Sequence, residues 1–331
     1  MLASRPLVTY HPPTIQPVIL KQLQQTGDNH AESRRMNNRN GILLMLCAMA
    51  GFTLEDAFFK HLSGTFSTNQ ILITSGIFGT LFFAAISLRK GHKLFSPHIW
   101  TRITLLRMLG EAIASVAFIK ALSLVPLPTV AAVFQVTPLA LTMGAALFLG
   151  EQVGWRRWLA IAIGFIGVML IIKPGVGTFD PSILWVIIAV LGTVTRDLIT
   201  RIIPDQISSS IISFQAFLAA TLIAALLLIV TPDTLIAVSA QQSVLFAGAI
   251  IFGIAGYYAI VAAMRVGDAA VVAPFRYTRL LFSMITGMLI FGEQLDRLSL
   301  LGAAVIITTG LYTFVRERQL LESGQSNKIP K

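Results

Sequence analysis

Phe148-Leu149-Gly150-Glu151-Gln152 closes one apolar run of this chain, and Phe291-Gly292-Glu293-Gln294 closes another run 142 residues later. At the same offset, the segment 120–131 aligns with the segment 262–273 and keeps small and apolar residues at matching positions. Self-similarity at a fixed offset is typical of a duplicated chain. The repeated Gly-Glu-Gln therefore predicts two halves of one design.

A second pair of stretches supports the duplication at an offset of 141. Glu55-Asp56-Ala57-Phe58-Phe59-Lys60 aligns with Arg196-Asp197-Leu198-Ile199-Thr200-Arg201, and both keep the spacing Asp-x-x-x-Lys/Arg. Two apolar segments can look alike by chance, but two shared polar patterns at nearly one offset favour a repeat.

The composition places these halves in a membrane. Hydrophobic residues make up 55% of the chain, charged residues make up 12%, and the mean hydropathy is +0.77. These values are typical of an integral membrane protein. Because about 20 apolar residues span a bilayer as a helix, we predict an all-α protein with ten transmembrane helices at 41–63, 69–88, 102–123, 128–149, 157–173, 181–202, 208–230, 243–264, 269–291 and 298–315.

The ten predicted spans divide into two five-helix repeats, 41–173 and 181–315. Since five is odd, the second repeat enters the membrane from the opposite side, which makes the repeats inverted. Inverted repeats are typical of transporters that work by alternating access around a midplane site. A disordered cytoplasmic tail, 1–40, and a cytoplasmic C-terminal tail, 316–331, are predicted to flank the repeats.

The basic residues predict the orientation of the spans. The net charge is +10, and with the N-terminus placed in the cytoplasm 17 of the 25 Lys and Arg residues fall in inside segments, against four outside: Lys60, Lys120, Lys173 and Arg297. This bias predicts a multi-pass protein of the cytoplasmic (inner) membrane with both termini cytoplasmic. The charge therefore indicates topology and contact with the lipid bilayer, including anionic headgroups, and not nucleic acid.

Ten spans, two five-helix halves and Gly-Glu-Gln at the ends of spans four and nine resemble the EamA-type transporters of the drug/metabolite transporter superfamily. The resemblance covers roughly 41–315. It implies a secondary active transporter of a small polar metabolite, such as an amino-acid derivative or a riboflavin-like or S-adenosylmethionine-like compound. It also implies a central cavity lined by spans three, four, eight and nine, with the Gly-Glu motif outside it. We expect that motif to end one helix and cap the next.

Eight ionisable residues lie inside predicted spans, four acidic and four basic, and such residues commonly face a polar pathway. Four at aligned positions are candidates for gating or coupling: Glu55, Asp56, Arg196 and Asp197. The spacing of four favours the local pairs Asp56 with Lys60 and Asp197 with Arg201. These could be gate ion pairs that break alternately, or Lys60 and Arg201 could extend their side chains to the membrane surface. Glu55 and Arg196 could also pair across the halves.

Arg276 and Arg279 are the strongest candidates for substrate binding. They lie one turn apart in span nine, which has no carboxylate before Glu293. Two cations inside a span need a negative partner, which could be Glu111, Asp197 or an anionic ligand. Guanidinium groups bind carboxylate and phosphate and stack on planar rings. Pro274 could open the helix beside them, as Pro138 could in span four. A salt-bridge cluster without a ligand is the alternative.

Other residues complete the predicted substrate site. Arg107 and Glu111 share a helix face in span three, either as a structural pair or as part of the site. Polar or aromatic groups near these charges are further candidates: Gln135, Tyr257, Tyr258 and Tyr277. The substrate is expected to carry a carboxylate, a phosphate or a planar ring.

Several kinds of chemistry lack a motif. The chain has no Walker A loop and no His-x-x-x-His pair, and its single cysteine, Cys47, excludes an intramolecular disulfide. We therefore predict no enzyme, no catalytic residue, no metal and no cofactor. A non-transporting receptor or scaffold and an intramembrane enzyme that uses the carboxylates are the alternatives. Protons are a candidate coupling ion, and a homodimer is left open.

Overall fold

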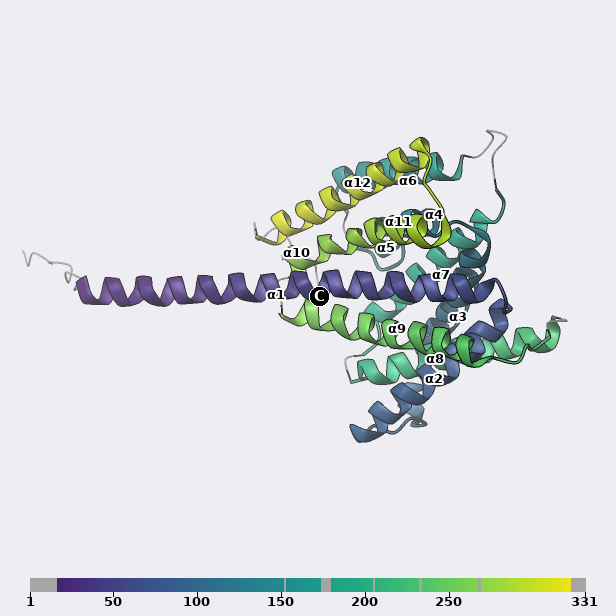
Figure 1. Ribbon diagram of the computed structural model, residues 1–331. Coiled ribbons are helices and arrows are strands. Elements are labelled where there is room, and N and C mark those ends of the chain that lie inside the picture. The colour runs from purple at the N-terminus through teal and green to yellow at the C-terminus, as the bar shows by residue number, and fades with distance from the viewer. Residues whose placement is uncertain are drawn as a thin grey trace, which may run out of the picture.

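The computed structural model describes residues 17–151, 153–173, 180–204, 206–231, 234–266 and 269–322. These residues form helices joined by short connections (Figure 1). In chain order they are α1 (Pro17–Ser63), α2 (Thr68–Arg89), η1 (Pro97–Ile99), α3 (Arg102–Leu124), α4 (Leu127–Phe134), α5 (Thr137–Phe148), α6 (Trp155–Ile172), α7 (Ile183–Arg201), α8 (Ser209–Val230), α9 (Ala240–Val266), α10 (Ala269–Val272), η2 (Ala273–Tyr277), α11 (Thr278–Phe291) and α12 (Arg297–Glu322).

Ten spanning units account for these helices within the described residues. Eight segments are long and apolar enough to cross a membrane, and the segment formed by α4 and α5 is one of them. The other two units are α3, whose 23 residues include four charged side chains, and the unit of α10, η2 and α11, whose longest helix has only 14 residues. The prediction of an all-α membrane protein with ten spans is confirmed.

Spans four and nine are broken helices. α4 ends at Phe134, and α5 begins at Thr137 with Pro138 in its first turn. In span nine a 3₁₀ segment that contains Pro274 separates α10 from α11. Proline lacks an amide donor and clashes with the preceding turn, so a helix is interrupted where it occurs. The predicted local opening beside both prolines is confirmed.

The first helix is longer than the predicted span 41–63. α1 begins at Pro17 and continues to Ser63. Proline is well accommodated in the first turn of a helix, and no other proline follows it in α1. The expected boundary at residue 41 is a change in hydropathy, and the backbone continues through it as one helix.

Helices of the two halves pack against each other in a symmetric pattern. The most extensive contacts join α1 with α9, α3 with α7, α2 with α8 and α6 with α12, while α4 contacts α11. Exchanging the halves turns the α1–α9 pair into the α7–α3 pair and leaves the α2–α8 and α6–α12 pairs in place. Figure 1 shows α6 and α12 at one edge of the bundle and α2 and α8 at the other. This arrangement is that of two five-helix repeats of inverted topology.

Glycines bring these paired helices into backbone contact at equivalent points. A Cβ on Gly192 of α7 would lie 2.8 Å from the Ala114 amide nitrogen of α3, and one on Gly51 of α1 would lie 3.2 Å from the Phe252 carbonyl of α9. Small residues are typical of close helix contacts in membranes. In the α3–α7 pair, this contact places the charged side chains of both helices within reach of one another.

Gly192→Ala is therefore expected to destabilise the protein by about 1–3 kcal/mol, because the added methyl meets backbone atoms that cannot rotate away. The measurement is the unfolding midpoint of the detergent-solubilised protein. Gly154→Ala is the matched control, since Gly154 has ordinary negative φ and a Cβ there would have no neighbour within 4 Å. Equal midpoints for the two variants would contradict the assigned close contact.

The bundle has two ends, which we call the first face and the second face. The first face is the end where α7 finishes at Arg201 and α6 begins at Trp155. The second face is the opposite end, where α1 finishes at Ser63 and α12 begins at Arg297.

Candidate substrate site between the two halves

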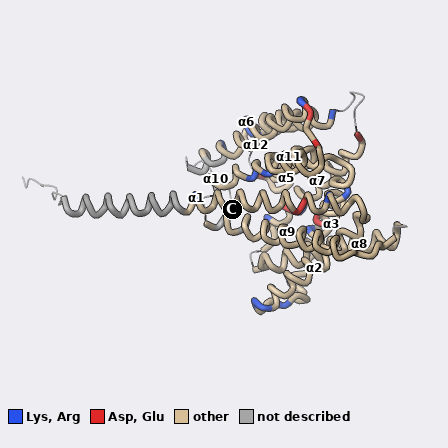
Figure 2. Tube along the Cα trace, viewed as in Figure 1, with Lys and Arg blue, Asp and Glu red and all other residues tan. Residues whose placement is uncertain are grey.

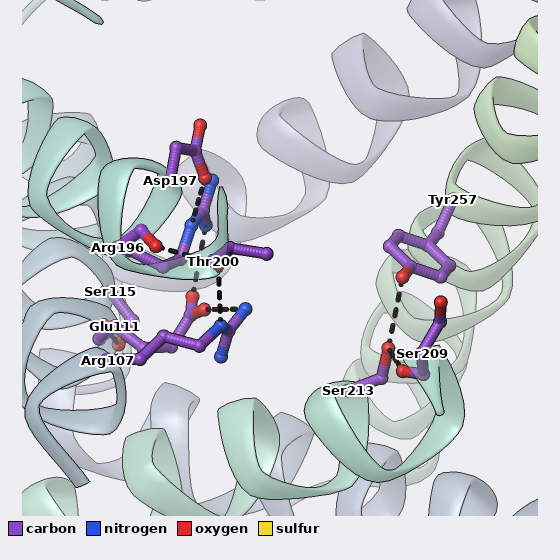
Figure 3. Close-up of polar contacts among 9 residues, drawn as sticks. All are labelled: Arg107, Glu111, Ser115, Arg196, Asp197, Thr200, Ser209, Ser213 and Tyr257. Atoms are coloured by element: carbon purple, nitrogen blue, oxygen red, sulfur yellow. Dashed lines mark hydrogen bonds and ion pairs between the residues drawn. The ribbon is translucent and has the colours of Figure 1, made fainter. Parts of the chain in front are cut away.

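Four charged side chains form a network between α3 and α7 (Figure 3). Glu111 lies 3.5 Å from Arg107 Nη2 and 3.3 Å from Arg196 Nη1, so one carboxylate bridges two guanidinium groups. Arg196 Nε donates a 2.8 Å hydrogen bond to Asp197 Oδ1. Figure 2 shows acidic and basic residues side by side in the middle of the bundle, where α1, α3 and α7 lie. The network joins the first half to the second.

Arg107 is the most buried member of the network, with 7% of its surface exposed. Its Nε donates a 3.0 Å hydrogen bond to Thr200 Oγ1 of α7. Its Nη1 is buried and has no hydrogen-bond partner among the described residues. Because an unsatisfied buried donor on a charged group is costly, this nitrogen is suited to receive an oxygen from a bound molecule.

Polar groups of α8 and α9 lie opposite Arg107. Ser213 Oγ is 3.1 Å from the Tyr257 hydroxyl, and Tyr257 keeps 39% of its surface exposed. Figure 3 shows the Arg107 guanidinium pointing toward the side on which Ser209, Ser213 and Tyr257 lie. The arrangement places a cation on one side and an aromatic ring with hydroxyls on the other.

A pocket leads to this region from the first face. Its volume is about 390 Å³, and Thr200 of α7 and Ser209 of α8 both line it. The remaining lining residues come from the end of α2, the α7–α8 connection and the start of α8: Lys90, Ile203, Pro204, Ile207, Ser208, Ser210 and Ile212. Since Thr200 is the residue that holds Arg107, the pocket reaches the edge of the charged network. The four-span cavity implied by the family resemblance stays a prediction.

The structure separates the predicted arginine pair. Arg279 Nη2 lies 2.6 Å from Asp56 Oδ2 of α1, and its guanidinium packs over the rings of Phe52 and Phe118 at 5.5 and 6.0 Å. The expected partners, Glu111 and Asp197, are therefore wrong for Arg279, because α11 packs on α1 at this depth. Arg279 of the second half therefore forms an ion pair with Asp56 of the first half.

Arg276 differs from Arg279 in lacking such a partner. Its side chain is exposed and makes no ion pair with a described residue. Asp197 and Arg196 act on it electrostatically. A place for Arg276 at the margin of the network stays a prediction.

Two predicted pairs four residues apart, Asp56 with Lys60 and Asp197 with Arg201, do not form. Lys60 binds Glu293 at 3.0 Å instead of Asp56, and Arg201 binds Glu151 at 2.9 Å instead of Asp197. Each Asp is already held by an arginine, and each cation points to a carboxylate supplied by the other half. Spacing along one helix brought these groups near, but the packing between helices selected the partners.

The predicted Glu55–Arg196 pair is also wrong. Arg196 binds Glu111 and Asp197, whereas the Glu55 carboxylate lies against Gly253 of α9. The repeat explains the difference, because Glu55 aligns with Arg196 and Gly253 aligns with Glu111. The α3–α7 contact therefore contains the Arg196–Glu111 ion pair, whereas at the equivalent α1–α9 contact the Glu55 carboxylate packs against Gly253.

The Gly-Glu motif acts partly as expected. Gly150 and Gly292 have φ of +71° and +67°, the left-handed conformation that ends a helix, so this part of the prediction is confirmed. The glutamates do not cap the following helix. At α12 that role belongs to Asp296, whose Oδ1 accepts hydrogen bonds from the Leu298 and Ser299 amides. Glu151 and Glu293 are used instead in the ion pairs with Arg201 and Lys60.

Three remaining candidates lie in different surroundings. Tyr258 is 74% exposed, Gln135 is buried at the break between α4 and α5, and the Tyr277 hydroxyl lies over Gly310 of α12. Their roles in binding stay predictions. Thr200, Ser209 and Ser213 were not predicted, although the four-residue spacing of the two serines in one span could have indicated a shared polar face.

Comparison with known proteins places the chain among transporters. Residues 39–173 and 180–315 each match the EamA-like transporter family. An S-adenosylmethionine uptake transporter of Rickettsia prowazekii (strain Madrid E) is 25% identical over 293 residues, which is 86% of this chain and 95% of that protein. A riboflavin transporter of Vibrio cholerae is 31% identical over 206 residues, 60% of this chain and 65% of that protein. A crystal structure with 15% identity covers 85% of this chain and 98% of its own with a TM-score of 0.56, and so shares the fold.

Proposed function

Because the chain belongs to the EamA-like transporter family of the drug/metabolite transporter superfamily, we propose that it is a secondary active transporter of a small polar metabolite. In this proposal the two inverted repeats alternate access to a site between them. The proposed position of the substrate rests on Arg107 Nη1, which is buried and has no hydrogen-bond partner among the described residues. A carboxylate or phosphate oxygen of the substrate would supply that partner.

The surroundings of Arg107 favour a substrate with an amino-acid group. Asp197 has a side chain 36% exposed, and only its Oδ1 accepts a hydrogen bond from a described residue. Its other oxygen can therefore accept an ammonium group while Arg107 binds the carboxylate. The S-adenosylmethionine uptake transporter among the relatives is named for a molecule of this class.

A planar vitamin is the second candidate. The half-exposed ring of Tyr257 lies beside polar groups of α8 and is suited to stacking on a flat ring system. The relative named a riboflavin transporter is consistent with this class of ligand. The two candidates differ in charge, since only the amino-acid derivative needs Asp197.

The orientation in the membrane is part of the proposal. The first face carries most of the flanking arginines, and Arg156, Arg157 and Arg316 lie together there. The positive-inside rule therefore favours a cytoplasmic first face, cytoplasmic termini and residence in the inner membrane. A proton bound by Glu55, Asp56, Glu111 or Asp197 is a candidate coupling ion.

Counterflow in proteoliposomes tests the function. We expect exchange of S-adenosylmethionine or riboflavin by the native chain, and at least about tenfold slower exchange by Arg276→Gln, because a cation at the margin of the site is lost. Arg156→Gln is the control, since Arg156 lies at the first face over the Trp155 ring. Decarboxylated S-adenosylmethionine should compete poorly if Arg107 binds the carboxylate.

Two outcomes would favour the alternatives. Saturable binding of a panel compound without counterflow would indicate a receptor or scaffold. Chemical conversion of the compound during the assay would indicate an enzyme. Equal exchange by the native chain and Arg276→Gln would contradict the place of Arg276 beside the site.

A further inference from the structure

We infer that the two copies of the Gly-Glu motif hold the gates of the transport cycle, one at each face. Each glutamate binds the cation of the Asp-x-x-x-Lys/Arg stretch in the opposite half: Glu293 binds Lys60, and Glu151 binds Arg201. We call Lys60–Glu293 the second-face latch and Arg201–Glu151 the first-face latch. The inference rests on the alternating access proposed above.

The repeat relates the two latches to each other. Glu151 and Glu293 align at the offset of 142, and Lys60 and Arg201 align at 141. Exchanging the halves therefore converts one latch into the other and moves it to the opposite face. Two equivalent ion pairs on opposite faces are what a transporter needs if each face is closed in turn by the same device.

The second-face latch is buried and makes several contacts. The side chains of Lys60 and Glu293 are 12% and 18% exposed. Lys60 Nζ also donates to the carbonyls of Leu122 and Val125 at the end of α3, at 3.1 and 2.9 Å. Glu293 Oε2 accepts a 2.8 Å hydrogen bond from the Leu127 amide at the start of α4.

These contacts use backbone groups that a helix leaves unpaired at its ends. The cation satisfies the C-terminus of α3 and the carboxylate satisfies the N-terminus of α4, as their charges favour. α1 and the end of α11 are thereby fixed to the turn between α3 and α4. The second face is held closed at that turn.

The first-face latch is weaker in the same structure. Arg201 and Glu151 have side chains 43% and 47% exposed, and the pair is a single 2.9 Å contact, Arg201 Nη1 to Glu151 Oε1. The pocket beside Thr200 and Ile203 opens at this face. Exposed ion pairs contribute little, whereas a buried pair with satisfied neighbours is costly to break. The structure thus has one strong and one weak latch, and the site is approached from the side of the weak one.

In the opposite state we expect the strengths to exchange. The Arg201–Glu151 pair becomes buried and the Lys60–Glu293 pair becomes exposed, so the site opens toward the second face. Neutralising one glutamate should then bias the equilibrium toward the state that is open at the face of that glutamate.

Cysteine labelling tests this without the need for a substrate. Cys47→Ser removes the only cysteine of the chain. Ile71→Cys in α2 and Ile212→Cys in α8 then serve as matched reporters, because they align at the offset of 141. Ile71 is 0% exposed near the second face, whereas Ile212 lines the pocket that opens at the first face. A membrane-impermeant maleimide is applied to intact cells and to inverted vesicles, so that each face is probed separately.

We expect Glu293→Gln to raise labelling of the Ile71→Cys reporter through the second face by at least about tenfold, and to lower labelling of the Ile212→Cys reporter through the first face. Glu151→Gln should leave the Ile71→Cys reporter protected, because it favours the state in which Ile71 is 0% exposed. Both substitutions should slow counterflow. Lys173→Gln is the control at the second face, since it breaks the outer Lys173–Asp296 pair and should change neither reporter.

The proposal is overturned if Glu293→Gln and Lys173→Gln give the same labelling, or if Glu151→Gln exposes the Ile71→Cys reporter as much as Glu293→Gln does. If Glu293→Gln does not fold, Lys60→Cys with Glu293→Cys, joined by a short bifunctional thiol reagent, should arrest counterflow until the link is reduced. Unimpaired counterflow of the linked protein would also overturn it. Latch-dependent labelling in a chain that moves no panel compound would separate failure of the proposed function from failure of the latches.

Discussion

Arg107→Gln is expected to lower counterflow of a carboxylate-bearing substrate by about 100-fold or more, the loss typical when one partner of a buried charge pair is removed. The substitution deletes the guanidinium whose buried Nη1 has no hydrogen-bond partner among the described residues. It also deletes the hydrogen bond to Thr200. Arg107→Lys should recover part of the rate, because it keeps the charge but lacks the forked donor geometry.

The fold should survive this change, because Glu111 keeps its ion pair with Arg196. Arg102→Gln, at the exposed first residue of α3, is the matched control and should transport at the native rate. Expression, gel-filtration profile and unfolding midpoint would verify folding of each variant. Native counterflow by a folded Arg107→Gln would show that the substrate does not bind here.

Much of the fold could be predicted because its signals are periodic or local. The long apolar runs predicted the spans, and the two Gly-Glu-Gln stretches predicted the duplication and its inversion. The prolines at 138 and 274 predicted the breaks in spans four and nine, since a missing amide acts on the turn in which it lies. The left-handed glycines Gly150 and Gly292 were predicted for the same reason.

The ion pairs were predicted poorly because they depend on contacts between helices. A spacing of four residues places Asp56 near Lys60 on one helix, but it carries no information about Arg279, 223 residues away along the chain. The contact of Gly110 and Gly192 decides how closely α3 approaches α7, and so brings Glu111 to Arg196. Such choices follow from tertiary packing and not from any local pattern.

The candidate site shows the same division. Arg107, Glu111, Arg196 and Asp197 were predicted as charged residues inside spans, and the structure brings these four together. Thr200 and Ser213 were missed, because a hydroxyl in an apolar span commonly bonds to the carbonyl four residues earlier, as both of these also do. Only the approach of another helix gives such a hydroxyl a second partner.

Asp56→Asn is expected to cause the largest loss of stability, about 3 kcal/mol or more, since it removes the anion from a buried ion pair and leaves the cation behind. Asp56 is 3% exposed, and Arg279 depends on it through a 2.6 Å contact. The Nε of Arg279 is already buried without a partner among the described residues. The measurement is the free energy of unfolding in detergent, taken from a denaturant titration.

Asp296→Asn is the control, because it breaks an ion pair in which the carboxylate side chain is 52% exposed. Burial acts to raise the pKa of the Asp296 carboxyl, but hydrogen bonds with Lys173 and Ser299 outweigh it and hold that pKa well below its usual range. Asp296 is therefore ionised in the folded protein at neutral pH, so Asp296→Asn removes a full charge. An exposed pair is worth about 1 kcal/mol or less.

The double variant Asp56→Asn with Arg279→Gln separates the pair from its parts. If the cost of Asp56→Asn comes from the unpaired guanidinium, removing that guanidinium should recover much of it, and the double variant should be less damaged than the sum of the single ones. Additive losses would mean that the two side chains stabilise the protein independently. In that case α1 and α11 would be joined by packing, including the stacking of Arg279 on Phe52, and not by the charges.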